Sequence, residues 1–97
     1  MVGFLKILPK EYISQTIGKQ LLRSATSIGA NVIEAQASPS KKDFANFYNI
    51  ALKSGNETKY WLLLIKATDK VVVVDQLLNE AIEICNILGK SLVTLRK

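Results

Sequence analysis

Residues 23–36 read RSATSIGANVIEAQ, and this stretch decides the fold because it joins helical spacing to an unusual number of small polar groups. The apolar positions that lead into it and run through it are Ile13, Ile17, Leu21, Ala25, Ile28, Val32 and Ala35. Steps of three and four residues place these side chains on one face of an α-helix. The polar groups between them could mark an active site, a binding face or a packing seam.

The polar residues of this helix form a line along its surface. Arg23, Ser27, Asn31 and Glu34 stand at i, i+4, i+8 and i+11. In the helix expected next, Ser54 and Glu57 are i and i+3, and antiparallel packing would bring the two helix centres face to face. Because an unpartnered polar group at such a seam costs about 1–3 kcal/mol, we predict an interhelical polar network of these six residues. A solvated face is the alternative.

The same periodicity predicts an all-α fold, an antiparallel up-and-down helical bundle in a single domain over residues 1–97. Its elements are three long helices at about 12–37, 40–67 and 75–96 and a truncated N-terminal helix at about 2–8, which Pro9 ends. Ser40 and Asp75 are suitable N-caps for the second and third long helices. The β-branched run VVVV at 71–74 is expected to be an extended connector.

Composition favours a reducing setting and an anionic partner. The 97 residues include 13 Lys and Arg against 8 Asp and Glu, a net charge of +5. Cys85 is the single cysteine, expected as a small core residue, so a cytoplasmic protein is predicted. No apolar run approaches the roughly 20 residues of a membrane span. A chain this short buries only part of its surface alone, which favours oligomerisation.

Residues suited to catalysis are few. The sequence has no histidine, so the commonest general base and metal ligand is missing, together with the E-x-x-H form of di-metal helical bundles. An enzyme would have to rely on Glu34, Glu57, Tyr48 and Tyr60. We therefore predict no catalytic, cofactor-binding or metal-binding residues, and no cofactor.

Three segments carry a resemblance to a known family. They are LRSATSIGANVIEA (22–35), SKKDF (40–44) and IALKSGNE (50–57). Together they resemble the bacterial "four helix bundle protein" family, whose genes were first noticed inside intervening sequences of large-subunit ribosomal RNA genes. The similarity covers about residues 20–66 and is looser over ILGKSLVTLRK (87–97).

The resemblance implies an antiparallel four-helix bundle that assembles into a ring-like homopentamer, with no known enzyme activity. A related branch, the accessory variability protein of diversity-generating retroelements, is a basic pentamer that binds nucleic acid and a reverse transcriptase. Two features depart from the family pattern. The first helix is cut to MVGFLKIL, and Glu34 is followed by Ala35 where the family usually has glycine, so the helix is expected to run on towards Ala37.

Two functions compete. The first is a homo-oligomer that binds RNA or DNA through exposed basic residues: Lys41, Lys42, Lys53 and Lys59, with Lys66, Lys90, Arg96 and Lys97 as further candidates. The second is a protein–protein interaction scaffold, favoured by the broad apolar surface of the last helix and by Tyr60 and Trp61. Basic and aromatic residues are poorly interleaved here, which is unlike a platform for stacking single-stranded bases.

Overall fold

The computed structural model describes residues 1–7, 12–68 and 73–96, and four α-helices make up this part of the chain. They are α1 (Val2–Ile7), α2 (Tyr12–Gln36), α3 (Lys41–Thr68) and α4 (Val73–Arg96). No strand occurs within the described ranges. The predicted all-α bundle, with one short and three long helices, is confirmed. The break predicted at Pro9 lies outside the described residues.

The turn between α2 and α3 follows the sequence signals closely. Ser40 caps α3, because its Oγ accepts a hydrogen bond from the Asp43 N–H at 3.1 Å. α2 ends at Gln36, one residue before the predicted end, and the Ala37 N–H still donates to the Glu34 carbonyl at 3.2 Å. Pro39 then prevents the helix from continuing. The prediction that Ser40 is the N-cap of the second long helix is confirmed.

The start of α4 corrects the predicted connector. α4 begins at Val73, so Val73 and Val74 are helical, while residues 71–72 lie outside the described part. Asp75 is not the N-cap but an acidic residue of the first turn, where a carboxylate favours the helix dipole. Helical geometry prevails because Val74 is fully buried against the core, and that burial outweighs the few tenths of a kcal/mol that a β-branched residue costs in a helix.

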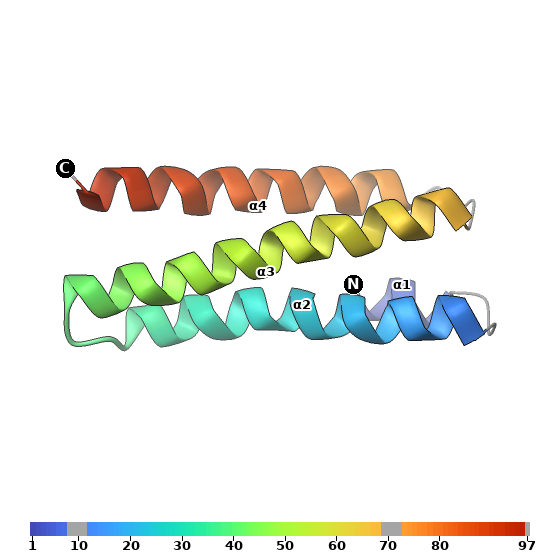
Figure 1. Ribbon diagram of the computed structural model, residues 1–97, viewed down its shortest axis with the longest axis horizontal. Coiled ribbons are helices and arrows are strands. Elements are labelled where there is room, and N and C mark those ends of the chain that lie inside the picture. Colours follow the sequence, from blue (N-terminus) through green and yellow to red (C-terminus); the bar gives the residue numbers. More distant parts are fainter. Residues whose placement is uncertain (8–11, 69–72, 97) are drawn as a thin grey trace.

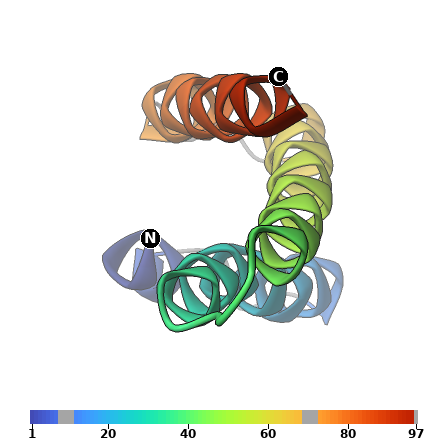
Figure 2. The same ribbon diagram turned by 90° about the vertical axis from the view of Figure 1, so that its left-hand side faces the viewer.

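The three long helices run antiparallel, and α3 lies between the other two. α3 packs against α2 on one side and against α4 on the other, whereas α2 and α4 form no comparable contact in the described chain. Viewed along the bundle, the helices therefore make a C-shaped section whose back is α3 (Figure 2). α1 lies beside α2 near one end of the bundle and covers only part of the open side (Figure 1).

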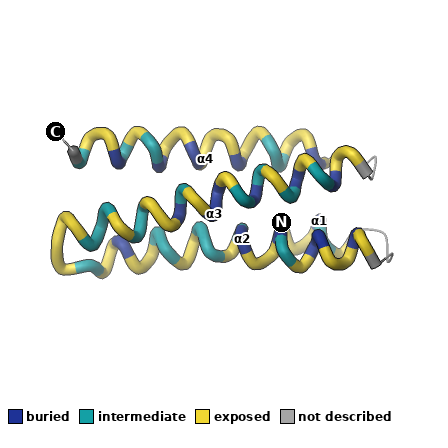
Figure 3. Tube along the Cα trace, viewed as in Figure 1, coloured by how far each residue is buried: buried dark blue, intermediate teal, exposed yellow. Residues whose placement is uncertain are grey.

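The hydrophobic core is built at the end where α1 lies. All four helices contribute to its buried cluster, which contains Phe4, Ile17, Leu21, Leu62, Ile65, Val74 and Ala81. Six residues are too few for a stable isolated helix, and Phe4, only 5% exposed, ties α1 to this core. Further along, the buried Ala35, Cys85 and Leu92 lie outside the cluster. Buried positions recur along α4, but exposed residues surround them (Figure 3).

Close packing of α3 on α4 depends on Gly55. A Cβ atom built on Gly55 would lie 2.6 Å from the Cys85 sulfur, and no other heavy atom but Ile28 Cδ1, at 3.9 Å, lies within 4 Å outside the local helix backbone. A separation of 2.6 Å is far below van der Waals contact, so either the sulfur or the helix must move. Cys85 is buried, as predicted, and its short side chain can move only by changing rotamer.

A double-mutant cycle tests this contact. Gly55→Ala should lower the free energy of unfolding by about 1–3 kcal/mol through overpacking, despite the better helix propensity of alanine. In a Cys85→Ala background the same change should cost at least about 1 kcal/mol less, because the sulfur is absent. Denaturant unfolding at fixed protein concentration measures all four variants. Additivity within about 0.5 kcal/mol would show that the two side chains do not clash.

Candidate functional site

A row of hydroxyl and amide groups lies in the seam between α2 and α3. The Ser54 hydroxyl donates to Ser27 Oγ at 2.9 Å, and Asn31 Nδ2 donates to the same oxygen at 3.1 Å and to the Ser27 carbonyl at 2.8 Å. One turn along, the Thr58 hydroxyl lies 2.9 Å from Ser24 Oγ and 2.8 Å from the Ser54 carbonyl. Paired hydroxyls are small enough to let two helices approach while their polar atoms stay satisfied.

Arg23 and Glu57 form an ion pair at the outer rim of this seam. Arg23 Nη2 contacts Glu57 Oε1, and Arg23 Nε donates to Gln20 Oε1 at 3.1 Å. The arginine side chain is 56% exposed and the glutamate side chain 34%, so solvent screens the attraction. The pair therefore orients the two helices but adds at most about 1 kcal/mol to stability.

Glu34 lies apart from the other five residues of the predicted network. Its side chain is exposed, and no residue of the described ranges bonds to it. The structure thus brings together Arg23 with Glu57, and Ser27 with Asn31 and Ser54. That these contacts govern assembly stays a prediction.

The seam also contains two residues outside the predicted network, Ser24 and Thr58. Ser24 is 0% exposed and Thr58 2% exposed, which makes them the most buried polar pair of the seam. These two positions could have been found from the sequence. Ser24 lies one turn before Ser27 on α2, and Thr58 lies one turn after Ser54 on α3. Antiparallel packing that pairs Ser27 with Ser54 therefore also brings Ser24 to Thr58.

The small residues of α2 and α3 lie on different surfaces of the bundle. Gly55 faces Cys85 of α4, as described above. A Cβ on Gly29 would meet nothing within 4 Å, because Gly29 lies on the open side of the bundle together with Ala25. Which helix a small residue meets depends on crossing geometry, which spacing alone does not define.

The four lysines predicted to contact nucleic acid all belong to α3. Lys41, Lys42 and Lys53 are exposed and Lys59 is half-buried, and no carboxylate among the described residues pairs with them. Of the further candidates, Lys66 is paired with Asp75 at 2.7 Å, and Lys90 lines a shallow hollow on α4. The Arg96 side chain and Lys97 lie outside what the structure describes.

Groups with catalytic chemistry are not gathered into a site. Tyr48 stacks on Phe44 with ring centroids 4.4 Å apart, and Tyr60 makes an edge contact with Trp61 at 5.0 Å. Glu57 is engaged by Arg23. Within residues 1–7, 12–68 and 73–96, no three His, Cys, Asp or Glu side chains lie close enough together to hold a metal ion. None of the helices is long and apolar enough, over the described residues, to cross a membrane.

These features define an all-α antiparallel bundle whose distinctive residues lie between helices and on exposed faces. A family model described as 23S rRNA-intervening sequence protein matches residues 2–90, so the chain belongs to this family. The recognition made from residues 22–57 is confirmed. The family description names no catalytic activity.

A solved structure supports both the family and the fold. It is a protein of unknown function from the S23 ribosomal protein family of Bacteroides thetaiotaomicron. The two chains are 41% identical, the match covers 94% of this chain and 86% of that chain, and the TM-score is 0.86. The comparison with curated proteins found no match.

The hydroxyl seam predicts a measurable coupling between Ser27 and Ser54. Ser27→Ala should lower the free energy of unfolding by about 1–2 kcal/mol, because the buried Ser54 hydroxyl and one Asn31 amide proton lose their acceptor. Adding Ser54→Ala should cost less than its effect alone, since no hydroxyl is then left unpaired. Chemical denaturation measures the cycle.

Glu34→Ala is the matched control for the seam. Its exposed, unpaired side chain should change the free energy of unfolding by no more than about 0.5 kcal/mol. Equal losses in Ser27→Ala and Glu34→Ala would contradict the assignment of the seam to the buried hydroxyls.

Proposed function

We propose that the protein is a non-enzymatic, homo-oligomeric helical-bundle protein of the cytoplasm that binds RNA or DNA. The observation that mainly supports this proposal is a basic, amide-rich stripe along the outer face of α3. Its members recur at i, i+4, i+7, i+11, i+14 and i+18, and all are exposed: Lys42, Asn46, Asn49, Lys53, Asn56 and Tyr60. We call these six residues the α3 stripe.

The α3 stripe has the chemistry that nucleic acid requires. Its lysines can neutralise phosphates, its asparagines can hydrogen-bond to base edges or to the backbone, and Tyr60, 54% exposed, can stack on a base. The two acidic residues of α3 lie off the stripe. Asp43 is in the first turn beside the Ser40 cap, and Glu57 is neutralised by Arg23. The charged members of the stripe, Lys42 and Lys53, are therefore both positive, and its other members are neutral.

The shape of α3 also suits this partner. Eighteen residues span about 27 Å of helix at 1.5 Å per residue. α3 forms the back of the C-shaped section, so its outer face projects from the molecule (Figure 2). The major groove of B-DNA, about 12 Å wide, admits one α-helix, and a single strand can follow a stripe of this length.

Homo-oligomerisation is supported by exposed apolar surface. Among the residues whose side chains the structure describes, thirteen large hydrophobic residues are exposed, including Ile33 at 70% and Ile87 at 64%. Soluble monomers rarely leave contiguous apolar patches uncovered. A homopentamer is the form that the resemblance implies.

A protein–protein scaffold is the second candidate function. Apolar residues on both sides of α4, such as Ile82 and Ile87, could receive another protein as well as another copy. Purification from the native host with and without nuclease separates the two functions. Partners that survive nuclease favour the scaffold, and partners lost with the nucleic acid favour the α3 stripe.

Fluorescence anisotropy of labelled RNA and DNA tests the α3 stripe. Lys42→Gln/Lys53→Gln should weaken binding and reduce the slope of log affinity against log salt by about 2, one unit per lost phosphate contact. Lys6→Gln/Lys19→Gln is the matched control, because it removes two exposed lysines from α1 and α2 and gives the same net charge, +5 − 2 = +3.

Two results would contradict this prediction. Equal weakening by the two double variants would show that binding follows net charge and not the α3 stripe. An absence of binding to either nucleic acid at about 50 mM salt, where electrostatic binding is strong, would exclude the nucleic-acid function.

Light scattering tests oligomerisation directly. The subunit mass is 10.7 kDa, so a pentamer has a mass of 5 × 10.7 = 53.5 kDa. We expect the pentamer at micromolar concentration. A particle of one subunit mass under these conditions would contradict homo-oligomerisation.

A further inference from the structure

The α3 stripe lies on the side of α3 that is farthest from both neighbouring helices. Residues 53–56 go once around α3, because each residue turns the direction by about 100°. Ser54 points to α2, since its hydroxyl donates to Ser27 Oγ at 2.9 Å. Gly55 points to α4, since a Cβ atom there would lie 2.6 Å from the Cys85 sulfur. The residues on either side of this pair are exposed members of the stripe, which therefore faces away from α2 and α4 alike.

This arrangement makes α3 a ridge. α2 and α4 lie at about a right angle to each other around α3, because the two residues that face them are neighbours in the chain. With helix axes about 8–10 Å apart, the axes of α2 and α4 lie about 5–6 Å behind that of α3 along the outward direction. The C-shaped section shows α3 at its convex back (Figure 2). A helix that projects in this way can enter a groove before its neighbours meet the groove walls.

Three asparagines with free amides occupy the centre of the ridge. Asn46, Asn49 and Asn56 are exposed, and no hydrogen bond within the described part of the chain engages their side chains. Asn31 of the seam, by contrast, donates to Ser27. An asparagine amide both donates and accepts, which matches the N6 and N7 edge of adenine in the major groove. The three amides span about 15 Å of helix.

Side chains that bind phosphate lie at both ends of this asparagine row. Lys42 is one turn before Asn46, and Tyr60 is one turn after Asn56. Where a straight helix leaves a groove its ends approach the phosphates, to which lysine and the tyrosine hydroxyl both bond. α3 as a whole carries five lysines and two carboxylates, a charge of +5 − 2 = +3. The ridge thus has base-reading groups at its centre and phosphate-binding groups at its ends.

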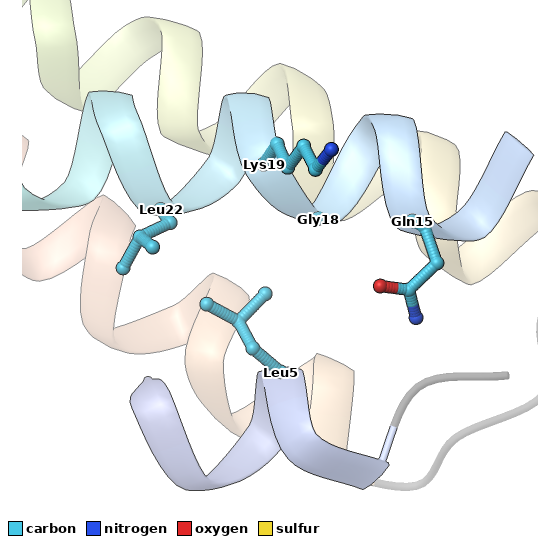
Figure 4. A pocket seen from close by; sticks show the side chains of 5 residues that line it. All are labelled: Leu5, Gln15, Gly18, Lys19 and Leu22. Carbon is cyan, nitrogen blue, oxygen red and sulfur yellow. The ribbon is translucent and has the colours of Figure 1, made fainter. Parts of the chain in front are cut away.

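Basic residues elsewhere are not arranged in this way. Lys19 is the one charged residue at the pocket between α1 and α2, where Leu5 and Leu22 project into the space between the two helices (Figure 4). Lys66 is paired with Asp75. A single cation among apolar side chains offers a duplex no line of contacts, so the α3 ridge is the surface of the described chain that fits a duplex best.

The shape of the ridge distinguishes between the forms of nucleic acid. B-form DNA has a major groove about 12 Å wide and about 8.5 Å deep, which admits a helix of about 10–12 Å diameter. The major groove of A-form RNA is too narrow for side chains to read. Proteins that bind single strands use a charged groove with several aromatic side chains. The α3 stripe is convex and has one aromatic member, Tyr60.

We infer that α3 binds in the major groove of double-stranded DNA and that its asparagines read adenine. This inference rests on the proposed nucleic-acid function and assigns its partner. Lys42, Lys53 and Tyr60 contact phosphates, which supplies affinity without sequence preference. Asn46 and Asn49, near the middle of the ridge, supply a preference for A·T base pairs.

Fluorescence anisotropy at low salt with four probes of equal length tests the partner. The probes are a DNA duplex of A·T pairs in mixed order, a G·C duplex, an A·U RNA duplex and one strand of the A·T duplex. We expect the A·T duplex to bind tightest, by about fivefold or more over the G·C duplex. Replacing adenine by 7-deazaadenine removes the N7 acceptor from the major groove and keeps base pairing, so it should weaken binding by about fivefold or more.

Two double variants of equal charge test the residues. Asn46→Ala/Asn49→Ala should reduce the effect of 7-deazaadenine by about fivefold or more, and it should leave the affinity for the G·C duplex and the salt slope unchanged, since no charge is lost. Asn79→Ala/Asn86→Ala, which changes two exposed asparagines of α4, should behave as the wild type. Circular dichroism verifies that both variants fold.

Equal affinity for the A·T and G·C duplexes would overturn the major-groove assignment and leave nucleic-acid binding intact. So would tighter binding to the RNA duplex or the single strand, or an effect of 7-deazaadenine that both double variants retain. An absence of binding to all four probes at about 50 mM salt would exclude the nucleic-acid function itself.

Discussion

The structure depends on α3, the helix that packs against both α2 and α4 in the described chain. Because α2 and α4 each pack on α3, they do not stabilise each other by direct packing of comparable extent. α1 supplies that stabilisation at one end, through Phe4 and the cluster around Leu21, Leu62 and Val74. At the other end the fourth side of the bundle is uncovered. The nucleic-acid proposal follows from this arrangement, because the outer face of α3 is not covered by another helix of the described chain.

The two seams of α3 are built differently. Towards α2, paired hydroxyls at Ser24–Thr58 and Ser27–Ser54 fix one antiparallel register, because a shift by one turn would separate both pairs. Towards α4, contact depends on the missing side chain of Gly55. A polar seam adds modest stability but defines register, whereas the glycine contact permits a close approach that adds dispersion and area. The stretch 23–36 is therefore a packing element of the α2–α3 hairpin.

Local signals in the sequence were sufficient to predict most of the fold. Apolar spacing in α2 and α3, the Ser40 cap and Pro39 act within a few residues, so their effect does not depend on the rest of the molecule. Val73 and Val74 were assigned wrongly because burial of Val74 against the core outweighs the β-propensity of this pair. The surroundings of Gly29 and Gly55 could not be predicted, since they depend on how the helices cross. Glu34 fits the polar line in sequence, but its side chain is exposed in the structure.

The central claim is the proposed homo-oligomer, in which other copies of the chain cover its exposed apolar residues. The most direct measurement is the midpoint of thermal unfolding as a function of protein concentration, because association that stabilises the folded state makes this midpoint concentration-dependent. The account predicts a rise of about 5 °C or more between about 1 and 100 µM, from the mass-action gain and the entropy of unfolding of a domain of this size. A midpoint that stays constant over this range would contradict it.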